Sequence, residues 1–77
     1  MEQAAFVVDC RPVRASEFFM QGFEDFEVCE QLPVDDAPAP ALHRWRVVVP
    51  GDRAEALVQH AQAAAHVVAV QEVASAA

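Results

Sequence analysis

Apolar and polar residues alternate most clearly in the second half of the chain, where the pattern predicts a strand, a helix and a second strand. Trp45 belongs to an alternation of apolar residues with arginines that runs over 43–49. A period of two residues is typical of a strand with one buried face. Residues from about 52 to 65 are rich in alanine and place apolar side chains at helical spacing. The β-branched residues over 66–73 again favour a strand.

The expected start of the helix carries its own signal. Pro50 and Gly51 end the preceding strand, because proline removes a ladder donor and glycine permits unusual dihedrals. Asp52 follows, and Glu55 lies three residues later. This spacing matches a capping box, in which two side chains satisfy backbone N–H groups that the first turn leaves free. We therefore expect Asp52 to be the N-cap.

Two further strands are expected in the first half of the chain, over 5–11 and over 25–32. Pro12 ends the first of them, because proline cannot donate to the ladder. In the second, Phe26 and Val28 alternate with residues that are mostly polar. This alternation indicates that Phe26 and Val28 face the core.

The segment over 14–23 lies between these strands and is rich in aromatic residues. Ser16 is a suitable helix cap, Phe19 and Phe23 are four residues apart, and Gly22 lies near the end. These features predict a short helix of about two turns. An irregular aromatic loop is the alternative.

The resulting order, strand–helix–strand–strand–helix–strand, predicts one small α+β domain over 1–77. A proline-rich loop is expected over 33–41 and a frayed tail over 74–77. In a chain of this length, the order most simply forms a ferredoxin-like βαββαβ sandwich. That fold has a four-stranded antiparallel sheet with both helices on one face, and right-handed crossovers place the first and third strands in its centre.

The two faces of that sheet differ in chemistry. The buried face receives the apolar side chains of Phe6, Val8, Phe26, Val28, Trp45, Val47 and Val49. The open face receives the charged side chains of Asp9, Arg11, Glu27, Arg44 and Arg46. Because the third strand lies between the first and the second, Asp9 and Glu27 should flank the two arginines of that strand. Such a ladder is either a solvated set of ion pairs or a face that docks a partner or a second copy.

Size and charge narrow the range of partners. A chain of 77 residues buries only about 60% of its unfolded surface, so its core is thin and a homodimer would bury more. The net charge of −7 argues against nucleic acid and against an anionic membrane, because both require clustered Lys and Arg. It favours a protein partner with a basic surface, although an acidic surface also serves solubility alone.

The sequence also indicates the cellular compartment of the protein. The chain shows no signal-peptide pattern and no apolar run that approaches a membrane span, so a cytoplasmic location is expected. Cys10 and Cys29 should then be free thiols, on opposite faces of the sheet and on strands that are not neighbours. The absence of Lys, Ile, Asn and Tyr, together with abundant Ala, is typical of a GC-rich genome and suggests a bacterium or its phage.

No motif for metal binding or catalysis is visible. The candidate ligands show neither C-x-x-C nor H-x-x-x-H spacing; they are Cys10, Cys29, His43, His60 and His66. The two hydroxyl side chains, Ser16 and Ser75, have no base that the sequence places beside them. We therefore expect no metal, no cofactor and no enzymatic activity.

The unit over 43–73 resembles the closing half of small regulatory modules of the ACT and heavy-metal-associated types. The ACT resemblance implies a dimer that senses a small ligand through a glycine-containing loop after the first strand. The heavy-metal resemblance implies a cysteine pair in that loop. Residues 11–14, Arg-Pro-Val-Arg, contain neither. A small dimeric ferredoxin-like enzyme that uses His43 or His66 is a further alternative.

The remaining feature is the run over 18–30, which interleaves acids with four of the five phenylalanines. Either the aromatic residues build the core and the acids face water, or the run forms a surface for a basic partner. We therefore expect a small non-enzymatic interaction module: a regulator, accessory subunit or inhibitor, of which phage-encoded inhibitors are one class. The residues expected to bind the partner are Asp9, Glu24, Asp25, Glu27, Glu30, Arg44 and Arg46.

Overall fold

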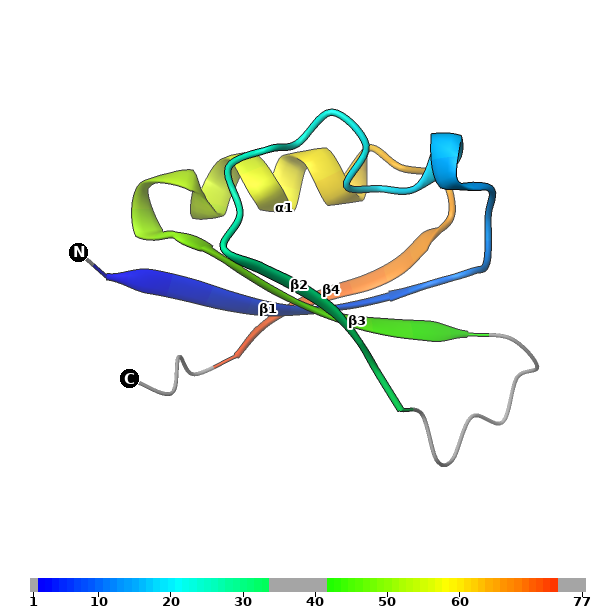
Figure 1. The fold of residues 1–77 in the computed structure, drawn as a ribbon, viewed down its shortest axis with the longest axis horizontal. Helices are drawn as coiled ribbons and strands as arrows, with labels where there is room; N and C mark the ends of the chain where they lie inside the picture. The colour runs from blue at the N-terminus through cyan, green and yellow to red at the C-terminus, as the bar shows by residue number, and fades with distance from the viewer. Residues whose placement is uncertain (1, 34–41, 74–77) are drawn as a thin grey trace.

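The computed structural model describes residues 2–33 and 42–73, which form a sheet with residues 11–27 and 51–66 packed on one face (Figure 1). The predicted loop over 33–41, apart from Pro33, and the predicted tail over 74–77 lie outside the described residues. The strands are β1 (Gln3–Cys10), β2 (Val28–Leu32), β3 (His43–Pro50) and β4 (Val67–Val73). The helical elements are a 3-10 turn η1 (Ala15–Glu17), a second 3-10 turn η2 (Gly51–Arg53) and the α-helix α1 (Ala54–Gln62).

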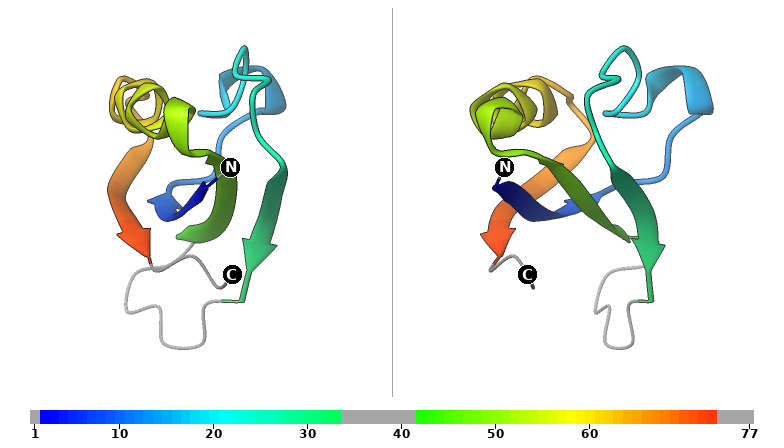
Figure 2. Two further views of the ribbon diagram at one scale, coloured as in Figure 1. Left: turned by 90° about the vertical axis from the view of Figure 1, so that its left-hand side faces the viewer. Right: turned by 60° about the vertical axis from the view of Figure 1, so that its left-hand side comes forward.

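The four strands form one antiparallel sheet in the order β2-β3-β1-β4. The predicted α+β class and the central position of the first and third strands are therefore confirmed. The predicted pair of helices is not confirmed, because α1 is the sole α-helix among the described residues. α1 packs on the sheet beside the segment that joins β1 to β2, and both lie on the same face (Figure 2).

That segment, residues 11–27, is called here the crossover segment, and the helix predicted within it over 14–23 is wrong. It contains the single 3-10 turn η1 and then two tight turns, in which Gln21 N–H donates to the carbonyl of Phe18 and Phe23 N–H to that of Met20. Gly22 has a φ of 85°, a left-handed conformation that ends any regular helix and that glycine adopts without strain.

The burial of the crossover segment explains the difference. Phe18 packs against the core, and Phe19 and Met20, which follow directly, are buried in it. Successive residues of an α-helix point about 100° apart, so one helix face cannot bury three in a row. The irregular path lets these side chains, and Phe23 after them, reach the core. Tertiary packing therefore overrides a modest helical preference.

The predicted capping box at the start of α1 is also wrong. The 3-10 turn η2 precedes the helix, and no side chain caps either element. Asp52 thus belongs to the turn and is exposed. The helix ends at Gln62, earlier than the predicted Ala65. Turns follow, in which the carbonyls of Gln59, Ala61 and Ala64 accept backbone hydrogen bonds, and these turns lead the chain into β4.

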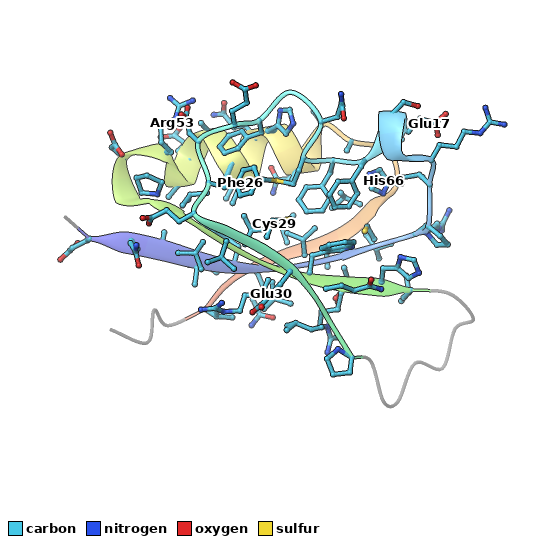
Figure 3. The ribbon with its side chains drawn as sticks, viewed as in Figure 1. Glu17, Phe26, Cys29, Glu30, Arg53 and His66 are labelled. Atoms are coloured by element: carbon cyan, nitrogen blue, oxygen red, sulfur yellow. The ribbon has the colours of Figure 1, made fainter. Side chains whose placement is uncertain are left out.

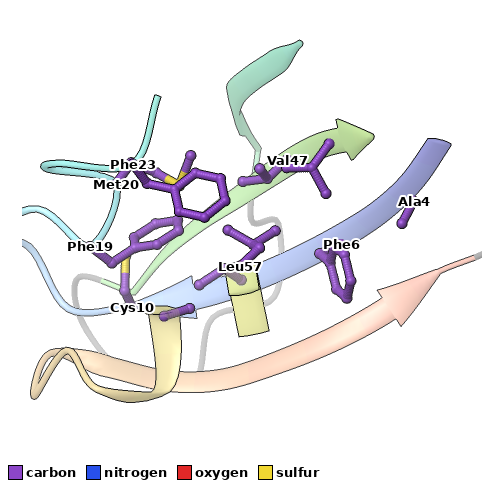
Figure 4. Close-up of a cluster of buried hydrophobic side chains, with 11 residues drawn as sticks. Ala4, Phe6, Cys10, Phe19, Met20, Phe23, Val47 and Leu57 are labelled. Carbon is purple, nitrogen blue, oxygen red and sulfur yellow. The ribbon is translucent and has the colours of Figure 1, made fainter. Parts of the chain in front are cut away.

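The core lies between the sheet, α1 and the crossover segment (Figure 4). Its largest fully buried side chains come from all three layers: Phe19, Leu57, Val8, Val47, Val49 and Cys10. The core positions predicted for β1 and β3 are confirmed for Phe6, Val8, Val47 and Val49, and Trp45 packs partly buried against them. The sheet-facing side of α1 contributes Leu57 and Ala61.

The core positions predicted for the second strand are wrong by one residue. β2 begins at Val28, which pairs with Val48 on the open face, whereas Cys29 pairs with Val47 on the core face. Phe26 precedes the strand and is 40% exposed. A shift of one residue moves every side chain of a strand to the opposite face.

Candidate functional site

The residues expected to bind a partner fall on two separate surfaces. The first is the acidic-aromatic surface, formed by Glu24, Asp25, Phe26 and Glu27 at the end of the crossover segment. All four side chains are exposed, and Phe26 is one of three exposed large apolar residues in the described part of the chain. Figure 3 shows Phe26 at the same end of the molecule as Arg53, where α1 begins.

Four contacts hold the acidic-aromatic surface in place. Asp25 Oδ2 forms an ion pair with the Arg53 guanidinium at 3.1 Å. The same guanidinium lies 5.9 Å from the ring centroid of Phe23, which is a cation–π distance. The Glu27 carboxylate accepts a hydrogen bond from the side-chain amide of Gln3, and its backbone N–H donates to the carbonyl of Val48 at 2.7 Å. The segment is therefore tied to β1, β3 and the start of α1.

The acidic-aromatic surface encloses a shallow hollow of about 370 Å³. Its lining consists of the four residues of that surface together with Pro50, Asp52 and Arg53. Four carboxylates thus surround one exposed ring and one guanidinium, and Asp25 already pairs with that guanidinium. The hollow can accept an apolar group at Phe26 and cationic groups around it.

The second surface is the open face of the sheet, where Asp9, Glu30, Arg44 and Arg46 lie. Arg44 Nε donates to Asp9 Oδ1 at 2.8 Å across the β1–β3 pair, as the sequence predicted. This hydrogen bond and the charge of Asp9 raise the pKa of the Arg44 guanidinium further above its usual range. The Arg44–Asp9 pair and a second pair between Arg46 and Glu30 leave little unpaired charge on this face.

The predicted partner of Arg46 is wrong. Arg46 pairs with Glu30 at 3.0 Å and not with Glu27, because Glu30 is the residue of β2 opposite Arg46. Arg11 was also expected on this face, but it follows the end of β1, where its N–H donates to the carbonyl of His66 at 2.9 Å. Both differences come from strand ends and register, which alternation alone does not fix.

An apolar row that the sequence analysis missed also crosses the open face. The register places Val28, Val48, Ala5 and Val73 opposite one another on the four strands. The sequence contains a sign of this row: Ala5 in the first strand and Val48 in the third are apolar residues at positions that alternate with the core residues. Val48 takes the next position in the series that Arg44 and Arg46 begin. The missing information was the register of the outer strands.

The two cysteines are free thiols. Their strands are not neighbours, as expected, but both side chains lie toward the core face, so the prediction of opposite faces is wrong. Burial raises the pKa of both thiols. For Cys10 the neighbouring Asp9 and Cys29 add to the rise, and the indole N–H of Trp45 opposes it without reaching hydrogen-bond geometry.

Within residues 2–33 and 42–73, no three His, Cys, Asp or Glu side chains come together in a way that would hold a metal ion. His43 lies at the start of β3, His60 in α1 and His66 just before β4. In the same part of the chain, no helix has the length and apolar character needed to span a bilayer.

Comparisons of the chain with protein families, with curated proteins and with solved structures found no match.

Proposed function

We propose that the protein is a non-enzymatic interaction module that binds a partner with a basic surface through the acidic-aromatic surface. The observation that carries this proposal is Phe26, an aromatic ring that is 40% exposed and lies among acids. Aromatic anchors with a charged rim are typical of the residues that dominate binding energy at protein interfaces. Such a module would act as a regulator, an accessory subunit or an inhibitor, by occupying the partner's basic patch.

The charge of the whole chain supports the same partner. A net charge of −7 on 77 residues produces a field that speeds encounter with cationic surfaces. Three of those charges, on Glu24, Asp25 and Glu27, lie within four consecutive residues of the acidic-aromatic surface. Salt screens such attraction over about 8 Å at physiological ionic strength. The affinity for a basic partner should therefore fall as salt rises.

The open face is the weaker candidate. Its arginines are already paired with Asp9 and Glu30, so a partner would have to compete with existing ion pairs. The hollow at the acidic-aromatic surface, by contrast, contains one ion pair among the four carboxylates that line it. We therefore assign partner binding to the acidic-aromatic surface.

We also propose that the fold is a ferredoxin-like sandwich in which an irregular segment replaces the first helix. The strand order β2-β3-β1-β4 supports this assignment. The crossover segment occupies the place beside α1 that a first helix would fill (Figure 2). A shape of this kind identifies an architecture and not an activity.

A defined probe tests the proposed function. A synthetic peptide of alternating Arg and Leu residues should bind, and a peptide of alternating Arg and Ser should bind more weakly because it offers Phe26 no apolar group. The variant E24Q/D25N/E27Q should weaken binding of the Arg–Leu peptide at least about tenfold at low salt, since it removes the charged rim.

The matched control is E17Q/E55Q/E72Q, which removes the same number of charges from exposed positions elsewhere. Isothermal titration calorimetry of both variants decides between local and global effects of charge. Equal affinity of the two variants, or equal binding of the two peptides, would show that the acidic-aromatic surface is not the binding site.

A further inference from the structure

A second cavity lies at the opposite end of the molecule from the acidic-aromatic surface. β1 runs from Gln3, which contacts Glu27, to Cys10, and eight residues of strand span roughly 25 Å. Beyond Cys10 a pocket of about 520 Å³ opens between the core-facing side of β3 and the crossover segment. This volume is in the range of small-molecule sites, about 300–1,000 Å³. It is called here the β1-end pocket.

The wall of the β1-end pocket is aromatic. The rings of Phe18 and Trp45 lie 4.8 Å apart at 59°, and both residues line the pocket while remaining partly exposed. The indole N–H of Trp45 is buried and has no hydrogen-bond partner among the described residues. The part of the indole that the pocket can reach is therefore ring carbon. Two tilted rings offer a flat apolar group both stacked and edge-to-face contacts.

The polar groups of the β1-end pocket are cationic or neutral. They are the side chains of Arg11, Gln21, Gln31 and His43, and none of the described lining residues is acidic. The acidic-aromatic surface, by contrast, lines its hollow with four carboxylates. Arg11 forms no ion pair with any described residue. Its guanidinium presents the fork of donors that binds a carboxylate through two hydrogen bonds.

The rim that carries Arg11 is held rigidly by His66, which Figure 3 places at this end of the molecule. Arg11 N–H donates to the carbonyl of His66 at 2.9 Å, and His66 Nδ1 lies 3.1 Å from the carbonyl oxygen of Arg11. A carbonyl only accepts, so Nδ1 carries the proton in this contact. The imidazole is buried near the rings of Phe18 and Phe19. The rim is therefore formed before any ligand arrives, which lowers the cost of binding.

We propose that the β1-end pocket binds a small aromatic carboxylate. The aromatic body of the ligand lies against Phe18 and Trp45, and its carboxylate is bound by Arg11 with help from His43 and the two glutamine amides. This site is independent of the acidic-aromatic surface, so either proposal can fail without the other. Partner binding and ligand binding would then occupy opposite ends of one small domain.

The test uses 3-phenylpropanoate as the probe and the intrinsic fluorescence of Trp45, which is the single tryptophan of the chain. Because Trp45 lines the pocket, binding should change its emission without any label. The expected result is a saturable change with a dissociation constant of about 1 mM or tighter. The neutral analogue, 3-phenylpropanamide, should bind at least about tenfold more weakly, because it lacks the charge that Arg11 recognises.

Two matched variants locate the site. R11Q should weaken binding of 3-phenylpropanoate about tenfold, and R14Q, which removes an exposed arginine outside the lining, should leave it unchanged. H43Q gives a second variant in the lining, and thermal unfolding of each variant confirms that it is folded. No saturable change up to about 10 mM probe, equal binding of the amide, or an equal loss in R14Q would overturn the proposal.

Discussion

Replacing Phe19 by alanine should destabilise this protein more than the same change at Phe26, although the two residues lie only seven apart. Phe19 is 2% exposed and packs its ring 4.6 Å from that of Phe18, between the sheet and α1. Phe26 is 40% exposed and lies outside the core. The comparison therefore tests whether the irregular crossover segment is an integral part of the core.

The magnitude follows from burial. Removing a fully buried phenylalanine costs about 3–5 kcal/mol, because the lost transfer energy and the cavity add together. A domain of 77 residues is stable by roughly 4–12 kcal/mol, so F19A should remove a large share of its stability. At about 4–8 °C per kcal/mol, the melting temperature should fall by at least about 12 °C. F26A should cost less than about 1 kcal/mol, because much of its ring already faces water.

Urea denaturation followed by circular dichroism measures both variants, with F19L as a milder substitution in case F19A does not fold. F19L should lower the midpoint in the same direction by a smaller amount. A loss below about 1 kcal/mol for F19A, or equal losses for F19A and F26A, would contradict the packing described for the crossover segment.

Three further predictions concern backbone, register and titration. G22A should destabilise by about 1–2 kcal/mol, because the site has a φ of 85° although a Cβ there would meet no other atom; unchanged stability in urea would contradict this conformation. C29D should destabilise more than V28D, because Cys29 lies on the core face and Val28 on the open face; the reverse order of melting temperatures would restore the register expected from the sequence. The free energy of unfolding should fall as pH rises above about 8.5, since a thiol pKa that burial raises in the folded state lets unfolding release protons. The chain has neither Lys nor Tyr to titrate in that range, so C10A/C29A should flatten the alkaline slope, and an unchanged slope would exclude the thiols as its cause.

The sequence predicted best where one face of an element is strictly apolar. The alternations around Phe6 and around Val47 placed both central strands correctly, because a register error there would expose several core side chains at once. The strand order followed from the order of the elements together with right-handed crossovers.

The sequence predicted poorly where side chains of mixed character allow two answers. β2 carries Val28, Cys29 and Leu32 on both faces, so its pattern does not fix the phase, and pairing with β3 decides it. In the crossover segment, the spacing of Phe19 and Phe23 fits a helix, but burial of consecutive residues favours an irregular path. Because of these two errors, Phe26 was expected in the core, whereas it lies on the surface.

The candidate site was likewise predicted only in part from the sequence. Composition and charge predicted which acids would be exposed, because carboxylates seldom lie in a thin core. They did not predict that Phe26 would lie exposed among those acids, or that a pocket without acids among its described lining residues would lie at the other end of β1. Both features depend on how the crossover segment folds, and this fold is set by contacts between residues far apart in the sequence.

A chemical-shift titration of the isotopically labelled protein with the Arg–Leu peptide tests most directly whether a basic partner binds at the acidic-aromatic surface. The largest backbone shifts should fall on residues 24–27 and on the facing residues Asp52 and Arg53, which line the same hollow. The amides of Asp9, Arg44 and Arg46 on the open face should change little. Largest shifts on the open face, or no saturable shift at low salt, would contradict the assignment of partner binding to the acidic-aromatic surface.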